Sequence, residues 1–152
     1  MLDAGRVFTH DRAHRSLNRD ECRRLLATQS LGRVALSVAA LPAVVPVLYR
    51  LVGDLIVFGV EPDDLYAVLS DNIVAFEVDH VDVVTFVGWT VLVVGRSRPA
   101  PHLSLPRFEL PGTGAFPPPD RLIGISIDRL SGRHTVGGVP ARHREPVSRS
   151  PA

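Results

Sequence analysis

The chain lacks the features that mark a secreted, membrane-spanning or metal-binding protein. Its single cysteine, Cys22, cannot form an internal disulfide and does not make a metal-binding framework. No stretch approaches the roughly 18 consecutive apolar residues of a membrane span. The basic N-terminal residues also lack the apolar core of a signal peptide. We therefore expect a cytoplasmic protein with no membrane partner.

Strong charge and the common catalytic motifs are missing as well. The formal net charge is only +1, which argues against nucleic acid as a main partner. Rossmann and P-loop glycine motifs, a nucleophile elbow and a catalytic carboxylate pair are absent. The run Asp79-His80-Val81-Asp82 contains metal-ligand residue types, but neighbouring side chains of a strand point to opposite faces. We interpret it as a polar turn, and the sequence names no metal ligand and no catalytic residue.

Short valine-rich segments separated by turns make up most of the chain. Its 152 residues, 45% of them hydrophobic, suit one domain with a substantial core. Asn18 and Glu21 begin a helix, and Asp63 or Asp64 caps a second, shorter helix at Leu65 to Leu69. Alternation and β-branched content predict six strands, at residues 33–38, 44–51, 55–58, 73–78, 85–95 and 122–127.

This order of segments predicts a mainly β fold, a six-stranded antiparallel barrel with two short helices. Few long crossovers and no repeated strand–helix alternation exclude a doubly wound sheet. A barrel of this size fills its interior with side chains, so a ligand must bind outside it or between two copies. We expect a flexible arm at residues 1–16, the barrel at 17–136 and a disordered tail at 137–152. The proline-rich stretch 99–119 is an irregular excursion, and whether it forms a lid stays open.

Five segments carry a further pattern, in a fixed order along the chain. They are Leu-Asn-Arg-Asp-Glu-Cys-Arg-Arg-Leu-Leu at 17–26, Gly-Arg-Val at 32–34, Leu-Pro-Ala-Val-Val-Pro-Val at 41–47, Val-Ala-Phe-Glu-Val-Asp at 74–79, and Gly-Trp-Thr-Val-Leu-Val-Val-Gly at 88–95. Together they resemble the pyridoxamine 5'-phosphate oxidase-like family of flavin-binding split barrels. Leu-Ser-Gly-Arg at 130–133 is similar to the family's closing segment. The resemblance implies a homodimer with FMN at the subunit interface, and members that oxidise, reduce or only carry flavins.

The resemblance also implies which residues line the flavin. Relatives grip the FMN phosphate with an arginine or threonine pair and then a serine–lysine pair, and neither pair is present in this chain. Gly59 and Val60 stand at the first pair and Asp64 and Leu65 at the second, while Val45 replaces an arginine. The implied cofactor-binding residues are Val45, Val47, Gly59, Val60, Asp64, Leu65, Trp89 and Thr90.

An acidic turn stands where the phosphate would bind. Glu61, Asp63 and Asp64 crowd this turn. Two like charges about 4 Å apart near a protein surface cost on the order of 4 kcal/mol before screening by salt. Arg33 and Arg50, on neighbouring predicted strands, are candidates to replace the missing cations.

Two functions remain open at this point. The first is a flavin-dependent oxidoreductase that binds FMN between the subunits of a homodimer. The second is a non-enzymatic dimeric binding module that has lost the FMN phosphate site. A variant of both is a site for a neutral or cationic flat small molecule that stacks on Trp89, the only tryptophan. Trp89 is equally suited to fill an interface core.

Overall fold

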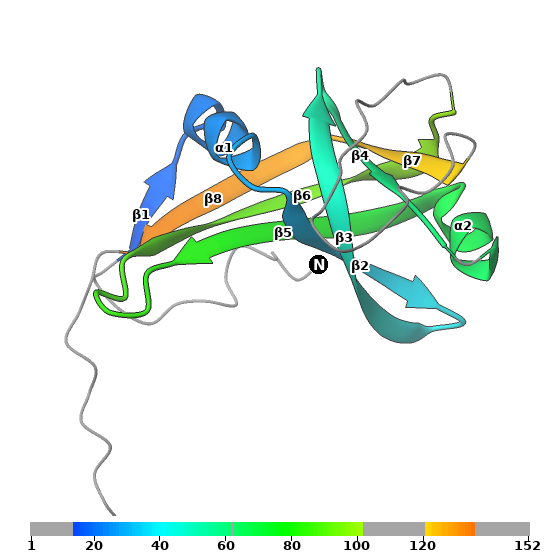
Figure 1. Cartoon of the computed structure of the whole chain (residues 1–152), viewed down its shortest axis with the longest axis horizontal. Helices are drawn as coiled ribbons and strands as arrows, with labels where there is room; N and C mark the ends of the chain where they lie inside the picture. The colour runs from blue at the N-terminus through cyan, green and yellow to red at the C-terminus, as the bar shows by residue number, and fades with distance from the viewer. Residues whose placement is uncertain (1–13, 62, 102–120, 136–152) are drawn as a thin grey trace, which may run out of the picture.

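The computed structural model describes residues 14–61, 63–101 and 121–135, which form antiparallel strands and two short helices (Figure 1). In chain order the elements are β1 (His14–Leu17), α1 (Arg19–Leu26), β2 (Leu31–Val38), β3 (Leu41–Val52), β4 (Leu55–Gly59), α2 (Asp63–Leu69), β5 (Asn72–Val81), β6 (Gly88–Pro99), β7 (Leu122–Ser126) and β8 (Arg129–Thr135).

Six of these strands close into a barrel. The sheet runs in the order β6, β5, β2, β3, β4, β7, and β7 pairs back onto β6. Each of these pairings is antiparallel. The strands β8 and β1 extend the sheet from the other side of β6. The predicted six-stranded antiparallel barrel with short helices is confirmed, and the extension adds to it.

One strand, β6, changes its pairing partner along one of its edges. Residues Gly88 to Val94 pair with β8, whereas Ser97 to Pro99 pair with β7. The change of partner occurs around Gly95, where a side-chain carbon would lie 1.6 Å from the carbonyl oxygen of Ser126. No side chain fits in that space, so glycine is required where β6 passes β7.

The barrel interior is filled by apolar side chains from every strand of the ring. Phe58 and Phe76 are the largest fully buried residues, and the ring of Tyr49 meets that of Phe76 edge-on at 4.8 Å between centroids. The Tyr49 hydroxyl donates a 2.6 Å hydrogen bond to the carbonyl oxygen of Leu26. Burial raises the pKa of Tyr49 to about 12. This bond fastens the end of α1 to β3, and the packed interior leaves ligand binding to the outer surface.

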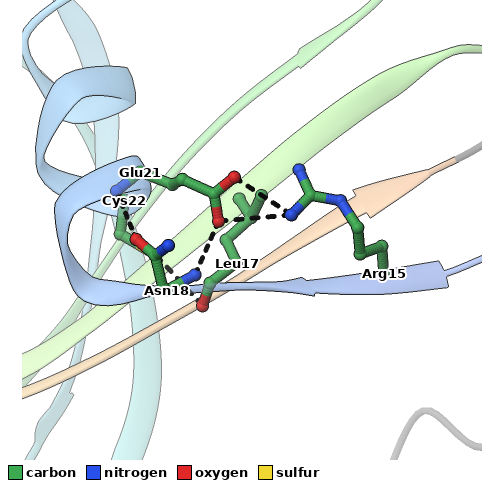
Figure 2. A network of polar contacts seen from close by, with 5 residues as sticks. All are labelled: Arg15, Leu17, Asn18, Glu21 and Cys22. Carbon is green, nitrogen blue, oxygen red and sulfur yellow. Dashed lines mark hydrogen bonds and ion pairs between the residues drawn. The ribbon is translucent and has the colours of Figure 1, made fainter.

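The first helix begins as the sequence predicts. The Asn18 side chain accepts a 2.9 Å bond from the backbone N–H of Glu21, and the Glu21 carboxylate accepts a 2.8 Å bond from the backbone N–H of Asn18. Figure 2 shows this reciprocal cap, together with Arg15 donating to the same carboxylate. Cys22 is buried beneath the helix against Gly132 of β8. The predicted start of the helix is confirmed, and Cys22 packs the helix against β8.

Two strands lie where none was expected. Structure was expected to begin at Leu17, yet β1 begins at His14, inside the expected arm, and β8 follows the strand expected to be last. Both strands are rich in charged or polar residues, so local alternation does not reveal them. They exist because β8 pairs with β6 and β1 with β8. The rest of the expected arm, the proline-rich stretch from residue 102 and the tail lie outside the described residues.

Candidate functional site

Four of the implied cofactor-binding residues lie together where β4 leads into α2. Gly59 ends β4, and Val60 is only 3% exposed and belongs to the core. Leu65 is half-buried and packs against that core. The carboxylate of Asp64 is exposed and accepts a 2.8 Å bond from the backbone N–H of Leu65. We call this group, Gly59, Val60, Asp64 and Leu65, the phosphate end. A ligand there would meet the carboxylate of Asp64 and backbone groups, and none of the four side chains is a cation.

A cation that the sequence analysis missed lies beside the phosphate end. Arg121 precedes β7, and the carbonyl oxygen of Arg121 accepts a 3.1 Å bond from the backbone N–H of Val60. The guanidinium carbon of Arg121 lies over the ring of Tyr66, 5.8 Å from the ring centroid. The pairing of Gly59 with Leu122 brings the two segments together. No short-range pattern could have found Arg121, because only the β4–β7 pairing relates it to this end.

The remaining implied residues of β3 face inward. Val47 is 7% exposed and is part of the core, and Val45 is half-buried against the core. A ligand would therefore meet their backbone rather than their side chains.

The proposed substitute cation Arg33 is already engaged. Its guanidinium donates to Glu77 at 2.8 Å and to Asp79 at 2.9 Å. The hydrogen bonds to Asp79 and Glu77 raise the pKa of Arg33. These three side chains form an ion-paired group across β2 and β5. Arg50, the other candidate, is exposed on β3 opposite Val57.

Trp89 and Thr90 lie at the start of β6 and point to opposite faces of the sheet. Trp89 is half-buried and packs against the core, and its ring is 6.5 Å from that of His80, tilted by 34°. In the sheet, Trp89 pairs with His80 of β5 on one side and with His134 of β8 on the other. Thr90 is exposed on the other face, between Asp79 and Arg133. We call the start of β6 the ring end, and one flat ligand there lies against Trp89 or against Thr90, not both.

The phosphate end and the ring end are far apart within one chain. Gly59 pairs with Leu122, and the next residue, Ile123, pairs with Pro99 at the end of β6. From Trp89 to Pro99 the strand spans about 33 Å at about 3.3 Å per residue. In Figure 1, α2 lies at one end of β5 and β6 and the loop joining these strands lies at the other. The structure does not bring the two groups of implied residues together in a single copy.

The run Asp79–Asp82, which we interpreted as a polar turn, is mostly strand, because β5 continues to Val81 in pairing with β6. An ordered turn begins only at Asp82. The carboxylate of Asp82 accepts bonds from the backbone N–H groups of Val84 and Thr85 and from the Thr85 hydroxyl, at 2.7 to 2.9 Å. The bonds from Thr85 and Val84 lower the pKa of Asp82. Within the described ranges, no group of histidine, cysteine and carboxylate side chains is placed to hold a metal. In the same ranges no helix is both long and apolar enough to cross a bilayer.

The closed barrel, with one long strand shared between two neighbouring strands, places the chain among the split-barrel proteins. Residues 18–104 match the family described as pyridoxamine 5'-phosphate oxidase, and the chain belongs to that family. The resemblance stated from the sequence is thereby confirmed.

Comparisons with individual proteins identify three similar chains. An uncharacterized protein of Mycobacterium tuberculosis is 35% identical over 85 residues, which are 52% of this chain and 56% of that protein. The chain thus matches just over half the length of that curated relative. The FAD binding protein from Mycobacterium smegmatis is 24% identical with a TM-score of 0.62, over 80% of this chain and 98% of its own. A FAD-binding protein from Mesorhizobium loti is 23% identical with a TM-score of 0.63, over 80% and 98% of the two chains. At these identities the two structures establish the fold.

Proposed function

We propose that this chain is a cytoplasmic flavin-binding protein that holds FMN or FAD between two copies and acts as a flavin-dependent oxidoreductase. Family membership and the two relatives described as FAD-binding support the ligand class. The observation that carries the proposal is the separation of the phosphate end from the ring end along β6. A ligand that uses both ends needs one of them from a second copy, as expected for a homodimer.

The residues present suit a flavin at both ends of such a shared site. At the ring end, Trp89 offers an indole face at the edge of the core, with His80 beside it. At the phosphate end, the guanidinium of Arg121 lies over the ring of Tyr66, the residue after Leu65. A bound flavin supplies the redox chemistry. The chain itself supplies binding, orientation of the ring and partial exclusion of water, and we assign no proton-transferring residue.

The acidic turn supports a second candidate function. Asp64 belongs to the phosphate end and Glu61 follows Val60 directly, and both side chains are exposed. Their charges oppose a phosphate. If they prevail over Arg121, the protein is a non-enzymatic dimeric module that has kept the barrel and lost its nucleotide.

Titration of the purified full chain with FMN and with FAD separates the two functions. Flavin binding to the native state raises its stability, by about 2.7 kcal/mol when free ligand is 100 times Kd. We expect saturable quenching of flavin fluorescence and a higher melting temperature. No response to either flavin up to millimolar concentration would overturn the flavin assignment and leave the binding module.

Paired variants at the ring end refine this test. Because Trp89 and Thr90 point to opposite faces, a flavin ring lying on the Trp89 face is sensitive to Trp89→Leu and not to Thr90→Val. We expect Trp89→Leu to weaken binding about tenfold, in line with roughly 1 to 3 kcal/mol for stacking of an aromatic base. The reverse pattern would place the ring on the outer face, against Thr90.

A further inference from the structure

The loop that joins β5 to β6 presents a cluster of apolar side chains to solvent. Of the large apolar side chains that are exposed in the described part of the chain, half belong to this loop and to the strand end beside it. Val83 and Val84 are 80% and 82% exposed. An exposed apolar cluster commonly marks a surface that contacts another molecule. We call residues 81–87 the apolar loop, and its exposed apolar members are Val81, Val83, Val84, Phe86 and Val87.

The polar groups of the apolar loop are bonded to its own backbone. The carboxylate of Asp82 accepts the N–H groups of Val84 and Thr85. The Thr85 hydroxyl accepts the N–H of Val87. The N–H of Asp82 donates to the carbonyl oxygen of Val87, and the N–H of Phe86 donates to the carbonyl oxygen of Asp82. Moving this loop out of water therefore leaves few backbone donors without a partner, so its burial costs little.

A second exposed apolar group lies at the opposite end of β5. Ile73, near the start of β5, is 59% exposed, and Leu41, at the turn between β2 and β3, is 71% exposed. Because β2 pairs antiparallel with β5, it runs toward the start of β5 as it enters this hairpin. In Figure 1 the hairpin and α2 lie at one end of β5 and the apolar loop lies at the other. We call this group the hairpin patch, and its members are Val38, Leu41, Val44 and Ile73.

The apolar loop and the hairpin patch are placed to meet in a twofold pair of chains. From Ile73 to Val81, β5 spans about 26 Å at about 3.3 Å per residue. An axis that crosses β5 near its middle, between two sheets that face each other, reverses the strand direction. Contacts across such an axis are reciprocal, so each apolar loop then lies on the hairpin patch of the other copy. Among the described residues, Leu31 is the one exposed large apolar side chain left outside these contacts.

The charges of the two groups favour a second protein surface over a membrane. The apolar loop contains one acidic residue, Asp82, and no basic residue. Residues 37–44 of the hairpin contain no charged residue. Segments that bind anionic lipid commonly carry lysine or arginine beside their apolar residues. An apolar surface without cations fits another apolar surface, and the hairpin patch supplies one.

We propose that the apolar loop of each copy packs on the hairpin patch of the other copy, and that these two equal contacts hold the homodimer. This inference rests on the homodimer of the proposed function, because it names the surface that joins the copies, and it does not depend on a bound flavin. The start of β6 follows the apolar loop directly. The contact therefore brings the ring end of one copy to the end of the other barrel that carries α2 and the phosphate end.

Sedimentation equilibrium of the full chain without flavin, over a dilution series, tests the contact. Val84→Asp and Leu41→Asp each place a carboxylate in one half of it. Because an unpaired buried charge is costly and each substitution occurs twice in a dimer, we expect either variant to raise the dimer Kd roughly 100-fold or more. Ser16→Asp is the matched control, since Ser16 is exposed on β1 and β8 lies between β1 and β6. This control should have the dimer Kd of the wild type.

Thiol cross-linking with a short bismaleimide shows which segments meet, and it does not require a weakened dimer. The variant that combines Val84→Cys with Leu41→Cys should give a linked dimer, because each new thiol lies beside the other type of position in the second copy. Val84→Cys alone and Leu41→Cys alone should stay unlinked, since like positions lie far apart across the axis. The native Cys22 is 1% exposed and should not react.

Each outcome separates this inference from the proposed function. If both carboxylate variants dimerise as tightly as the wild type, or if Ser16→Asp loses the dimer equally, the contact is wrong while the homodimer stands. The same holds if the double cysteine variant links no more than the single ones. If the wild type is a monomer at every concentration, the homodimer and this inference both fall. Sedimentation of such a monomer with phosphatidylglycerol vesicles would assign the apolar loop to lipid instead.

Discussion

Protonation of Glu21 at low pH is expected to weaken the start of the first helix, because the charged carboxylate of Glu21 caps it. This carboxylate accepts the backbone N–H of Asn18 and two contacts from Arg15, at 3.0 and 3.3 Å (Figure 2). The bond from the Asn18 backbone and the hydrogen bond from Arg15 lower the pKa of Glu21. The charged form is thus favoured by the folded state, and the same side chain joins the start of α1 to β1.

The effect of pH on stability follows from the direction of that pKa shift. A carboxyl group with a lowered pKa in the folded state contributes stability above its unfolded pKa, here 4.5, and the contribution is lost as pH falls through the folded value. We expect Glu21→Gln to lower the free energy of unfolding at pH 7 and to have less effect at pH 3, measured by urea unfolding. Asp20→Asn, an exposed neighbour in the same helical turn, is the control. Equal losses at both pH values would contradict the role of the charge.

At the scale of elements, β6 holds the barrel and its extension together. It pairs with β5 along its length, with β8 through Val94 and with β7 from Ser97. Between these partners, Gly95 passes the Ser126 carbonyl too closely for any side chain. Closure of the barrel therefore depends on a single residue without a Cβ atom.

Two glycine variants test this dependence. Gly95→Ala places a carbon against backbone and should destabilise the protein by about 3 kcal/mol or more. Gly124→Ala, at a buried position of β7, meets its nearest atom at an ordinary 3.5 Å and should change stability by less than about 1 kcal/mol. The free energies of unfolding in urea give the comparison. Similar values for the two variants would show that β6 and β7 adjust without cost.

The sequence predicted the elements whose pattern is local and missed those set by distant partners. Alternating buried residues such as Val74, Phe76 and Val78 identified the barrel strands because each strand has one face in the core. The strands β1 and β8 carry mostly polar residues, so only pairing defines them. Arg121 was missed for the same reason, since strand pairing, and no spacing in the sequence, brings it to Gly59.

At the scale of the whole molecule, the candidate site is divided between two ends of one chain. Gly59 and Arg121 lie near the end of β6 that carries Pro99, and Trp89 lies near its start. A single flavin contacts both groups only if the second comes from another copy. Flavin binding and dimer formation are then linked, so the ligand should stabilise the dimer against dilution.

A mixed dimer gives a direct test of the divided site. Arg121→Gln and Trp89→Leu damage opposite ends, so a dimer with one copy of each variant has one site with both native ends and one with neither. Co-expression of the two variants should restore tight FMN binding at about a quarter of the sites, given random pairing in a twofold dimer. Each variant expressed alone should have no site with tight FMN binding. Absence of recovery in the mixture would show that the two ends do not belong to one shared site.

The position of Trp89 also has an optical consequence. Because the chain has one tryptophan, indole emission from this protein comes from a single place, at the start of β6 between His80 and His134. That side chain is half-buried, so the wavelength of its emission reports how wet the ring end is without any introduced label. The natural sequence therefore contains its own site-specific spectroscopic probe. A shift in Trp89 emission on dilution would report the binding of a second copy at this end of the barrel.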